Sequence, residues 1–304
     1  MARPPSPKAL TALDQRLQEV MKTWRPAGLV VALVADDKVV FLKGYGVRSV
    51  GHAGAVDGDT LFQLASISKP LSSALIGSYV DEGRLSWSDR IVDRLPGFRV
   101  GDPLVTADLR LEDVLSHRSD VEATNWLIDV PDLTWRQSVD RLKTLPQQAP
   151  FRSRMIYDNF MYSVGGQTIV ALGDDYGEAM RRRLFAPTGM TRSLADFESI
   201  VDPAGLAGCH ECELPPGAPD AFASIRPGIA NVATPHVRVK DADTTSIHWR
   251  HVASTAASSG MSSASDMARF VRMILNRGEI DGHRVLQART VDQILARRSL
   301  LPSD

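Results

Sequence analysis

The stretch FQLASISKP, residues 62–70, places a serine hydroxyl and a lysine amine three residues apart, at Ser66 and Lys69. Because residues i and i+3 share one face of a helix, the two side chains meet if a helix begins here. A lysine that is neutral, or that shares its proton, can accept the serine proton and so activate a weak nucleophile. Pro70 fits a helix only in its first turn, so we expect the helix to begin near Ser66 or later.

A second candidate stretch is FRSRMIYDNFMY, residues 151–162, which contains Tyr157 and Asn159. A tyrosine beside a lysine ammonium is pushed toward the phenolate, because a nearby positive charge favours the charged form. Such a tyrosine can act as general base and later as general acid, and Asn159 can hydrogen-bond the lysine or a substrate carbonyl. Taken alone, each stretch also has a reading without chemistry: a serine-rich turn in the first, and a buried tyrosine with a satisfied hydroxyl in the second.

Composition and charge exclude several classes of protein. The 304 residues are 43% hydrophobic and 23% charged, which is an ordinary globular balance. With 35 basic and 36 acidic residues the formal charge is -1, so we expect no nucleic-acid partner. Residues 1–20 lack the apolar core of a secretory signal, and the apolar run over residues 28–35 is too short to span a bilayer. These observations predict a cytoplasmic protein without a membrane partner.

The two cysteines, Cys209 and Cys212, stand close together in the sequence CHEC. A zinc or redox site of this kind needs further ligands, and the chain has no second CxxC pair. No histidine follows at an evident ligand spacing. We therefore expect no metal site and no cofactor.

The hydrophobic pattern indicates one domain of the α/β (α+β) class over residues 1–304. Residues 10–23 have the spacing of an amphipathic helix. Two apolar runs, 28–35 and 39–42, are separated by Asp36-Asp37-Lys38 and predict a β-hairpin. Further helices are predicted over residues 71–83, 111–117, 135–145, 160–172, 178–185 and 265–276.

Three details of this pattern are testable against a structure. Ser265 is predicted to cap the last of these helices. His117 and Arg118 are interpreted as structural residues that finish the helix begun near Leu111. Residues 283–300 show no alternating strand pattern.

Beyond these patterns, the chain resembles the serine β-lactamase and penicillin-recognising family. The similarity is greatest to the branch of class C β-lactamases, family VIII carboxylesterases and D-amino peptidases. The stretches that carry the resemblance are GYGV at 44–47, DGDTLFQLASISK at 57–69, DEGRL at 81–85, LPGF at 95–98, LEDVLSHRS at 111–119, residues 151–159, ATPH at 233–236 and GMSSASDMARF at 260–270.

The resemblance implies an antiparallel sheet flanked by helices, with a large helical insertion at about residues 71–244. The sheet-associated part is then expected at about 1–70 and 245–304. The site residues implied are Ser66 as nucleophile, Lys69 as its activator, Tyr157 as the proton-transfer residue and Asn159 as the orienting residue.

The chain also departs from the pattern of that family. Asp120 stands where the family usually has glycine, and residues 256–260 read AASSG where it usually has Pro-Ala-Gly-Gly. The third motif, Lys-Thr-Gly or His-x-Gly on a strand beside the serine, is not found. We therefore expect the C-terminal strands to be missing from this chain, together with one oxyanion donor. An open sheet edge should result, to be covered by a second chain or another copy.

The function expected is that of a serine hydrolase that forms an acyl-enzyme on Ser66. A carboxylesterase acting on small esters is the first hypothesis. A β-lactamase or D-amino peptidase acting on amides is the second, because ester and amide acylation use the same nucleophile. A third hypothesis is a truncated or non-catalytic chain that needs a second polypeptide.

Overall fold

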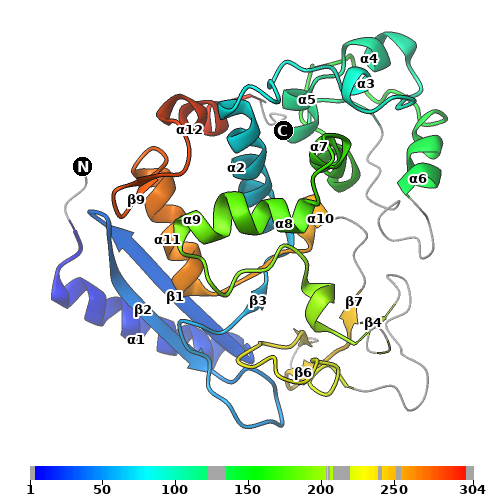
Figure 1. Ribbon diagram of the computed structural model, residues 1–304. Helices are drawn as coiled ribbons and strands as arrows, with labels where there is room; N and C mark the ends of the chain where they lie inside the picture. The colour runs from blue at the N-terminus through cyan, green and yellow to red at the C-terminus, as the bar shows by residue number, and fades with distance from the viewer. Residues whose placement is uncertain are drawn as a thin grey trace.

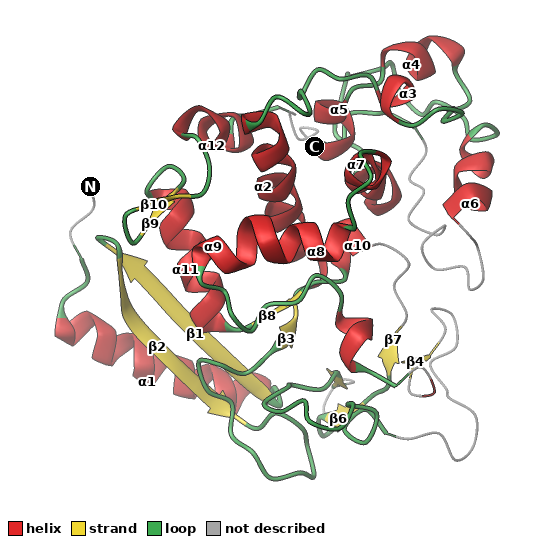
Figure 2. Cartoon of the chain, viewed as in Figure 1, coloured by secondary structure: helices red, strands yellow, loops and turns green. Residues whose placement is uncertain are grey.

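The computed structural model of the chain describes residues 4–121, 135–202, 204, 206–207, 220–238, 242–250 and 255–298. A long β-hairpin with a helix along it occupies one side of the molecule, and a group of helices occupies the other (Figure 1). Figure 2 shows that the strands outside the hairpin are short. None of the helices within the described residues combines the length and the apolar character needed to cross a bilayer.

The hairpin joins β1 (Gly28–Ala35) to β2 (Lys38–Gly46), as the apolar pattern predicts. Asp36 and Asp37 form its turn, with φ angles of 47° and 59°. Left-handed angles at both central residues give a turn whose twist matches that of the strands, and aspartate tolerates them better than most residues. The strands pair antiparallel along their length, with a register shift after Leu33.

Two amphipathic helices flank the hairpin: α1 (Pro7–Trp24) packs on β2 and α11 (Ala264–Leu275) packs mainly on β1 (Figure 1). The cap of α11 differs from the prediction. Ser263 accepts the Asp266 N–H at 3.2 Å, whereas Ser265 already lies inside the helix. The prediction was wrong by two residues because both serines precede the same apolar pattern.

Among the described strands, none pairs with the edge of β1 that faces away from β2. Within the described residues, β2 is the only strand that pairs with β1. Every residue of β1 is partly exposed, although its sequence GLVVALVA is apolar. The sequence predicts an open sheet edge, and an unpaired edge is a site at which another strand can pair.

The centre of the helical part is α2 (Ser68–Asp81), which is buried on nearly all sides. Ala74, Leu75, Ile76 and Tyr79 are fully buried. A helix that is buried on nearly all sides has to be enclosed by other elements. The helices that pack on it are α7 (Asn159–Ala171), α8 (Tyr176–Met180), α10 (Thr255–Ser258) and α12 (Ala288–Leu295).

The remaining helices of the insertion are α3 (Ile91–Arg94), α4 (Pro103–Asp108), α5 (Leu111–Leu115), α6 (Trp135–Leu142) and α9 (Ala186–Thr188), with a π-helical turn η3 (Arg181–Phe185) and a 3-10 turn η4 (Phe197–Ile200). A further 3-10 turn, η1 (Ala65–Ile67), precedes α2. The helix predicted over residues 178–185 is therefore split into α8 and η3, and α12 was not predicted as a helix.

Eight further strands of two residues each form short pairs. They are β3 (Phe62–Gln63) with β8 (Met261–Ser262), β4 (Leu206–Ala207) with β7 (Trp249–Arg250), β5 (His236–Val237) with β6 (Thr245–Ser246), and β9 (Glu279–Ile280) with β10 (His283–Arg284). A second, smaller core lies near them, where the Trp249 ring stacks on Phe197 with 5.9 Å between the ring centres.

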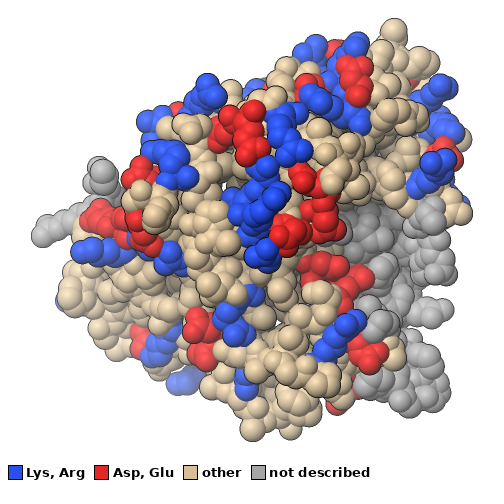
Figure 3. Space-filling model, viewed as in Figure 1, with Lys and Arg blue, Asp and Glu red and all other residues tan. Residues whose placement is uncertain are grey.

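Charged side chains of both signs are interspersed on the face shown in Figure 3. Many of them form ion pairs. Arg183 contacts Glu82 at 2.7 Å, and Arg152 contacts Asp108 and the fully buried Asp113, each at 2.7 Å. The Arg152 pairs tie the start of the segment that leads into α7 to the helices before it.

Candidate active site

Ser66 lies in η1, the turn that leads directly into α2. Backbone contacts on both sides hold this turn: the Leu64 N–H donates to the Gly260 carbonyl at 2.8 Å, and the Gly260 N–H donates to the Ser68 hydroxyl at 3.0 Å. Ala65 has a φ of 46°, a left-handed conformation that is uncommon outside glycine. Strain of this kind is often found at functional sites, and here it lies directly before an exposed serine.

Lys69 brings its amine to that serine, with 3.0 Å between Nζ and the Ser66 Oγ. A lysine ammonium has three N–H donors. The other two reach the Asn159 side-chain oxygen at 2.6 Å and the Ala257 carbonyl at 3.1 Å. Lys69 is 7% exposed, and this burial lowers its pKa, although the neighbouring Tyr157 opposes the effect. A lowered pKa is what a lysine needs to accept a proton from serine.

Tyr157 approaches the same serine oxygen from another direction. Its hydroxyl donates to the Ser66 Oγ at 2.6 Å. The Lys69 Nζ lies 4.8 Å from the centre of the Tyr157 ring, a distance at which a cation is attracted to the ring face. The serine oxygen is therefore in contact with two groups that can carry a proton.

Asn159 is placed by the start of α7. Asp158 caps this helix, because its side chain accepts the Met161 N–H at 3.0 Å. Asn159 is the first residue of the helix, and its oxygen accepts from Lys69. The structure thus brings together the four residues that the sequence singled out, Ser66, Lys69, Tyr157 and Asn159. Their catalytic roles stay predictions.

Tyr162 and Ser73 are parts of the site that the sequence analysis missed. The Tyr162 hydroxyl donates to the backbone carbonyl of Lys69 at 2.7 Å and lies 2.5 Å from the Ser73 hydroxyl. Burial raises the pKa of Tyr162, so this tyrosine stays neutral and acts as a fixed donor. One signal was available: Tyr162 follows Asn159 by three residues and so shares its face of α7.

His117, which the sequence predicts to be a structural residue that finishes a helix, lies beside two tyrosines of the site. Its ring centre lies 4.5 Å from that of Tyr157 and 5.6 Å from that of Tyr162. Burial and the positive charge of Lys69 lower the pKa of His117 to about 4. The imidazole is therefore neutral around pH 7.

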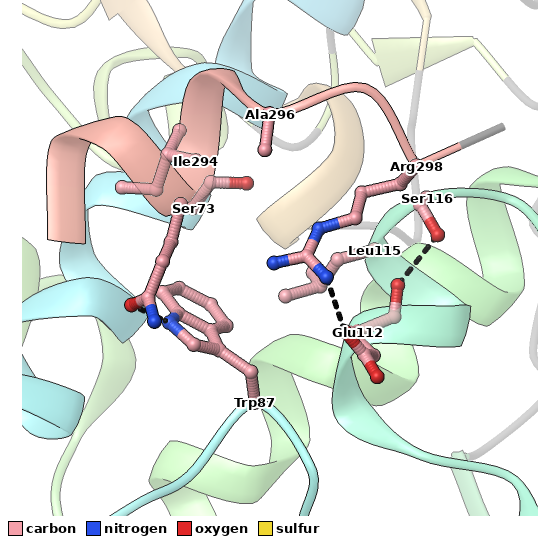
Figure 4. Close-up of a pocket in the computed structure, with 9 residues that line it drawn as sticks. Ser73, Trp87, Glu112, Leu115, Ser116, Ile294, Ala296 and Arg298 are labelled. Atoms are coloured by element: carbon pink, nitrogen blue, oxygen red, sulfur yellow. Dashed lines mark hydrogen bonds and ion pairs between the residues drawn. The ribbon is translucent and has the colours of Figure 1, made fainter. Parts of the chain in front are cut away.

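A separate cavity of about 250 Å³ lies beside α2 (Figure 4). Its lining residues are Ser73, Trp87, Glu112, Leu115, Ser116, Gln293, Ile294, Ala296 and Arg298. Figure 4 shows Arg298 reaching toward Glu112, with 2.8 Å between the charged groups. Ser73, which lies against Tyr162, lines this cavity, whereas none of the four predicted site residues does.

Within the described parts of the chain, no group of three or more His, Cys, Asp or Glu side chains is arranged to hold a metal ion. The CHEC sequence with Cys209 and Cys212 lies outside the described residues.

Several known proteins are similar to this chain. Penicillin-binding protein 4 of Amycolatopsis lactamdurans is 30% identical over 265 residues, which cover 86% of this chain and 63% of that protein. The unguisins hydrolase ungD of Aspergillus violaceofuscus is 27% identical over 198 residues, covering 62% of this chain and 35% of that protein. The chain thus spans less than two thirds of the length of either relative.

The fold has solved counterparts as well. The octameric penicillin-binding protein homologue from Pyrococcus abyssi superposes with a TM-score of 0.74 at 20% identity, covering 93% of this chain and 59% of that one. The family model described as Beta-lactamase matches residues 13–299. Together with the β-lactamase-like fold and the contact between Ser66 and Lys69, this match shows that the chain belongs to the beta-lactamase family.

Proposed function

We propose that this chain is a serine hydrolase that forms an acyl-enzyme on Ser66 and that acts on small carboxylic esters. One observation carries the proposal. The Ser66 oxygen lies 3.0 Å from the Lys69 amine and 2.6 Å from the Tyr157 hydroxyl. A hydroxyl in contact with two proton carriers is the arrangement that an activated nucleophile requires.

In the acylation step the Ser66 oxygen attacks the ester carbonyl carbon, and its proton passes to the neutral Lys69 amine. The carbonyl oxygen becomes an oxyanion. The N–H groups in the first turn of the η1–α2 segment favour that negative charge. The bond to the alcohol then breaks, the leaving oxygen takes the proton of Tyr157, and Lys69 returns the serine proton to Tyr157. Water attacks the acyl-enzyme by the same route, which releases the carboxylic acid and restores the serine.

Esters are the proposed substrates because an alcohol needs less protonation to leave than an amine does. Because Tyr157 is 39% exposed, a leaving group that needs little protonation suits the site. Amides, including β-lactams and D-amino peptides, are the second candidate class. The similarity to penicillin-binding protein 4 of Amycolatopsis lactamdurans favours them. The rates of one sample on a nitrophenyl ester and on a chromogenic β-lactam would rank the two classes.

A fluorophosphonate probe followed by peptide mapping tests the nucleophile. We expect the label on Ser66 and its complete loss in Ser66→Ala, together with loss of ester hydrolysis. Ser88→Ala, at an exposed serine, is the matched control and should label like the wild type. Labelling that survives Ser66→Ala, or that maps to Ser68, would show that the assignment is wrong.

We also propose that a strand from a second polypeptide or a second copy pairs with β1. The support is the apolar and partly exposed β1, which is paired on one edge within the described residues. If this strand carries an oxyanion donor, the chain alone should turn over about 10²–10³-fold more slowly than the assembly. Light scattering and hydrogen exchange of the β1 amides provide the test. The proposal would be contradicted if the chain is monomeric, its β1 amides exchange fast, and its turnover is nevertheless not reduced.

A further inference from the structure

The turn after α5 has an unusual backbone. His117 and Asp120 have φ angles of 58° and 53°, and both side chains are buried. Left-handed conformations outside glycine are uncommon and cost energy, so two of them in one short turn need a compensating role. The Asp120 carboxylate compensates for part of this cost, because it accepts hydrogen bonds from the N–H groups of Ser153 at 3.1 Å and Arg154 at 3.3 Å. The turn thereby holds the beginning of the segment that carries Tyr157.

His117 holds the other end of the same segment. Its carbonyl accepts the Ile156 N–H at 2.9 Å, and its Nδ1 accepts the Asp158 N–H at 3.2 Å. These are the residues directly before and after Tyr157. The imidazole also lies against the tyrosine itself, with 4.5 Å between the ring centres and 36° between the ring planes. One side chain and its backbone thus fix Tyr157 through both neighbours and through its ring.

The hydrogen bond to Asp158 also extends the effect of His117 to the start of α7. Asp158 is the cap of that helix, and Asn159, the next residue, accepts from the Lys69 amine at 2.6 Å. A shift of Asp158 would therefore move Asn159 together with Tyr157. The Nδ1 of His117 therefore holds the residue that lies between the two contacts of the lysine with this segment, Tyr157 and Asn159.

The imidazole has to be neutral to make this contact, because Nδ1 accepts a hydrogen bond only when it carries no proton. Its surroundings favour that state. The side chain is 8% exposed, and the titratable groups that face it are Lys69, Tyr157, Tyr162 and Asp158. The positive charge of Lys69 opposes a second positive charge on the histidine.

We propose that His117 is a positioning residue of this site, which holds the Tyr157 hydroxyl and the Asn159 side chain against Ser66 and Lys69. The inference rests on the proposed acyl transfer at Ser66. A histidine that only filled the core would change folding stability and leave the rate of the folded enzyme unaltered. The test must therefore separate rate from stability.

Three substitutions separate the two contacts of the side chain. His117→Ala removes both the acceptor and the ring. His117→Asn keeps an acceptor close to the position of Nδ1, and asparagine tolerates the left-handed backbone. His117→Phe keeps a ring and removes the acceptor. Each variant is first checked by thermal unfolding, and kcat and KM are then measured on a p-nitrophenyl ester.

We expect His117→Ala to lower kcat by about 100-fold, the effect of a misplacement of roughly 1 Å, with KM changed by less than about threefold. His117→Asn should recover about tenfold of that loss. Equal kcat values for His117→Ala and the wild type would overturn the proposal, and so would equal losses in His117→Ala and His117→Asn. If His117→Ala does not fold, His117→Asn is compared with His117→Phe instead. Equal losses of kcat in these two variants would overturn the proposal.

A second measurement keeps this inference separate from the proposed function. If the wild type neither labels at Ser66 nor hydrolyses esters, the proposed function has failed, and the positioning is still decided by hydrogen exchange of the Asp158 amide followed by NMR. We expect slow exchange in the wild type and His117→Asn, and faster exchange in His117→Phe. Equal exchange in all three proteins would overturn the role of Nδ1.

Discussion

Acidification is expected to destabilise this protein in part through His117. Burial and the charge of Lys69 lower its pKa from 6.5 to about 4. Between these two values the unfolded chain binds a proton that the folded chain does not, so the free energy of unfolding decreases as the pH falls. At 1.36 kcal/mol per pKa unit, the loss between pH 6.5 and pH 4 is about 3 kcal/mol. Solvent screens little of this effect, because the side chain is 8% exposed.

The assay is urea unfolding at a series of pH values from about 7 to about 4, for the wild type and for His117→Asn. Asparagine does not titrate, so the carboxylates and the other histidines contribute equally to both proteins and cancel in the difference. The free energy of unfolding of the wild type, relative to the variant, should therefore fall by about 3 kcal/mol over this range.

His283→Asn is the matched control, since His283 is exposed and makes no contact with the site residues described above. It should leave the pH dependence of the wild type unchanged. If the curves of the wild type and His117→Asn run parallel to within about 0.5 kcal/mol, a difference comparable to ordinary surface substitutions, then His117 titrates normally. The inference from its contacts that burial keeps the His117 imidazole neutral would then be wrong.

Two further predictions concern the site and its support. Lys69→Ala, Tyr157→Phe and the double variant should show similar losses of kcat on an ester substrate, because residues that act as a unit are not additive; multiplicative losses would mean that the two side chains act independently. In the wild type, the N–H groups of Ser153 and Arg154 donate to different oxygens of the Asp120 carboxylate. In Asp120→Asn the amide nitrogen would face one of these N–H groups, so the free energy of unfolding in urea should be lower by about 1–3 kcal/mol. A variant as stable as the wild type would contradict this account.

The features that could be predicted from the sequence are those set by local geometry. Pro70 restricts where a helix can begin, and the structure indeed starts α2 at Ser68, directly after the η1 turn that holds Ser66. The short spacing between Ser66 and Lys69 then brings hydroxyl and amine together whatever the rest of the chain does. The hairpin is local in the same way, because two apolar runs on either side of Asp36-Asp37 leave few other arrangements.

The features that could not be predicted are those made by backbone groups. The Ala257 carbonyl receives the third N–H of Lys69, and the Gly260 N–H donates to Ser68. Any residue type supplies such a carbonyl or N–H, so neither position carries a signal in the sequence. His117 is a related case. Its contacts depend on a left-handed turn that brings it to Asp158 across the chain, and no regular spacing encodes such a turn.

In the proposed mechanism, the contacts of Lys69 allow the site to move a proton without rearranging. A charged Lys69 donates to Ser66, Asn159 and the Ala257 carbonyl, which satisfies all three N–H groups.

A neutral Lys69 keeps its donors toward Asn159 and Ala257 and turns its lone pair to Ser66, whose hydroxyl then donates to the amine over the same 3.0 Å. Tyr157 donates to the serine oxygen in both states. The two states therefore differ in the position of one proton while the heavy atoms stay in place. Removing either Lys69 or Tyr157 breaks this shared path, and that is the physical reason for expecting their substitutions to be non-additive.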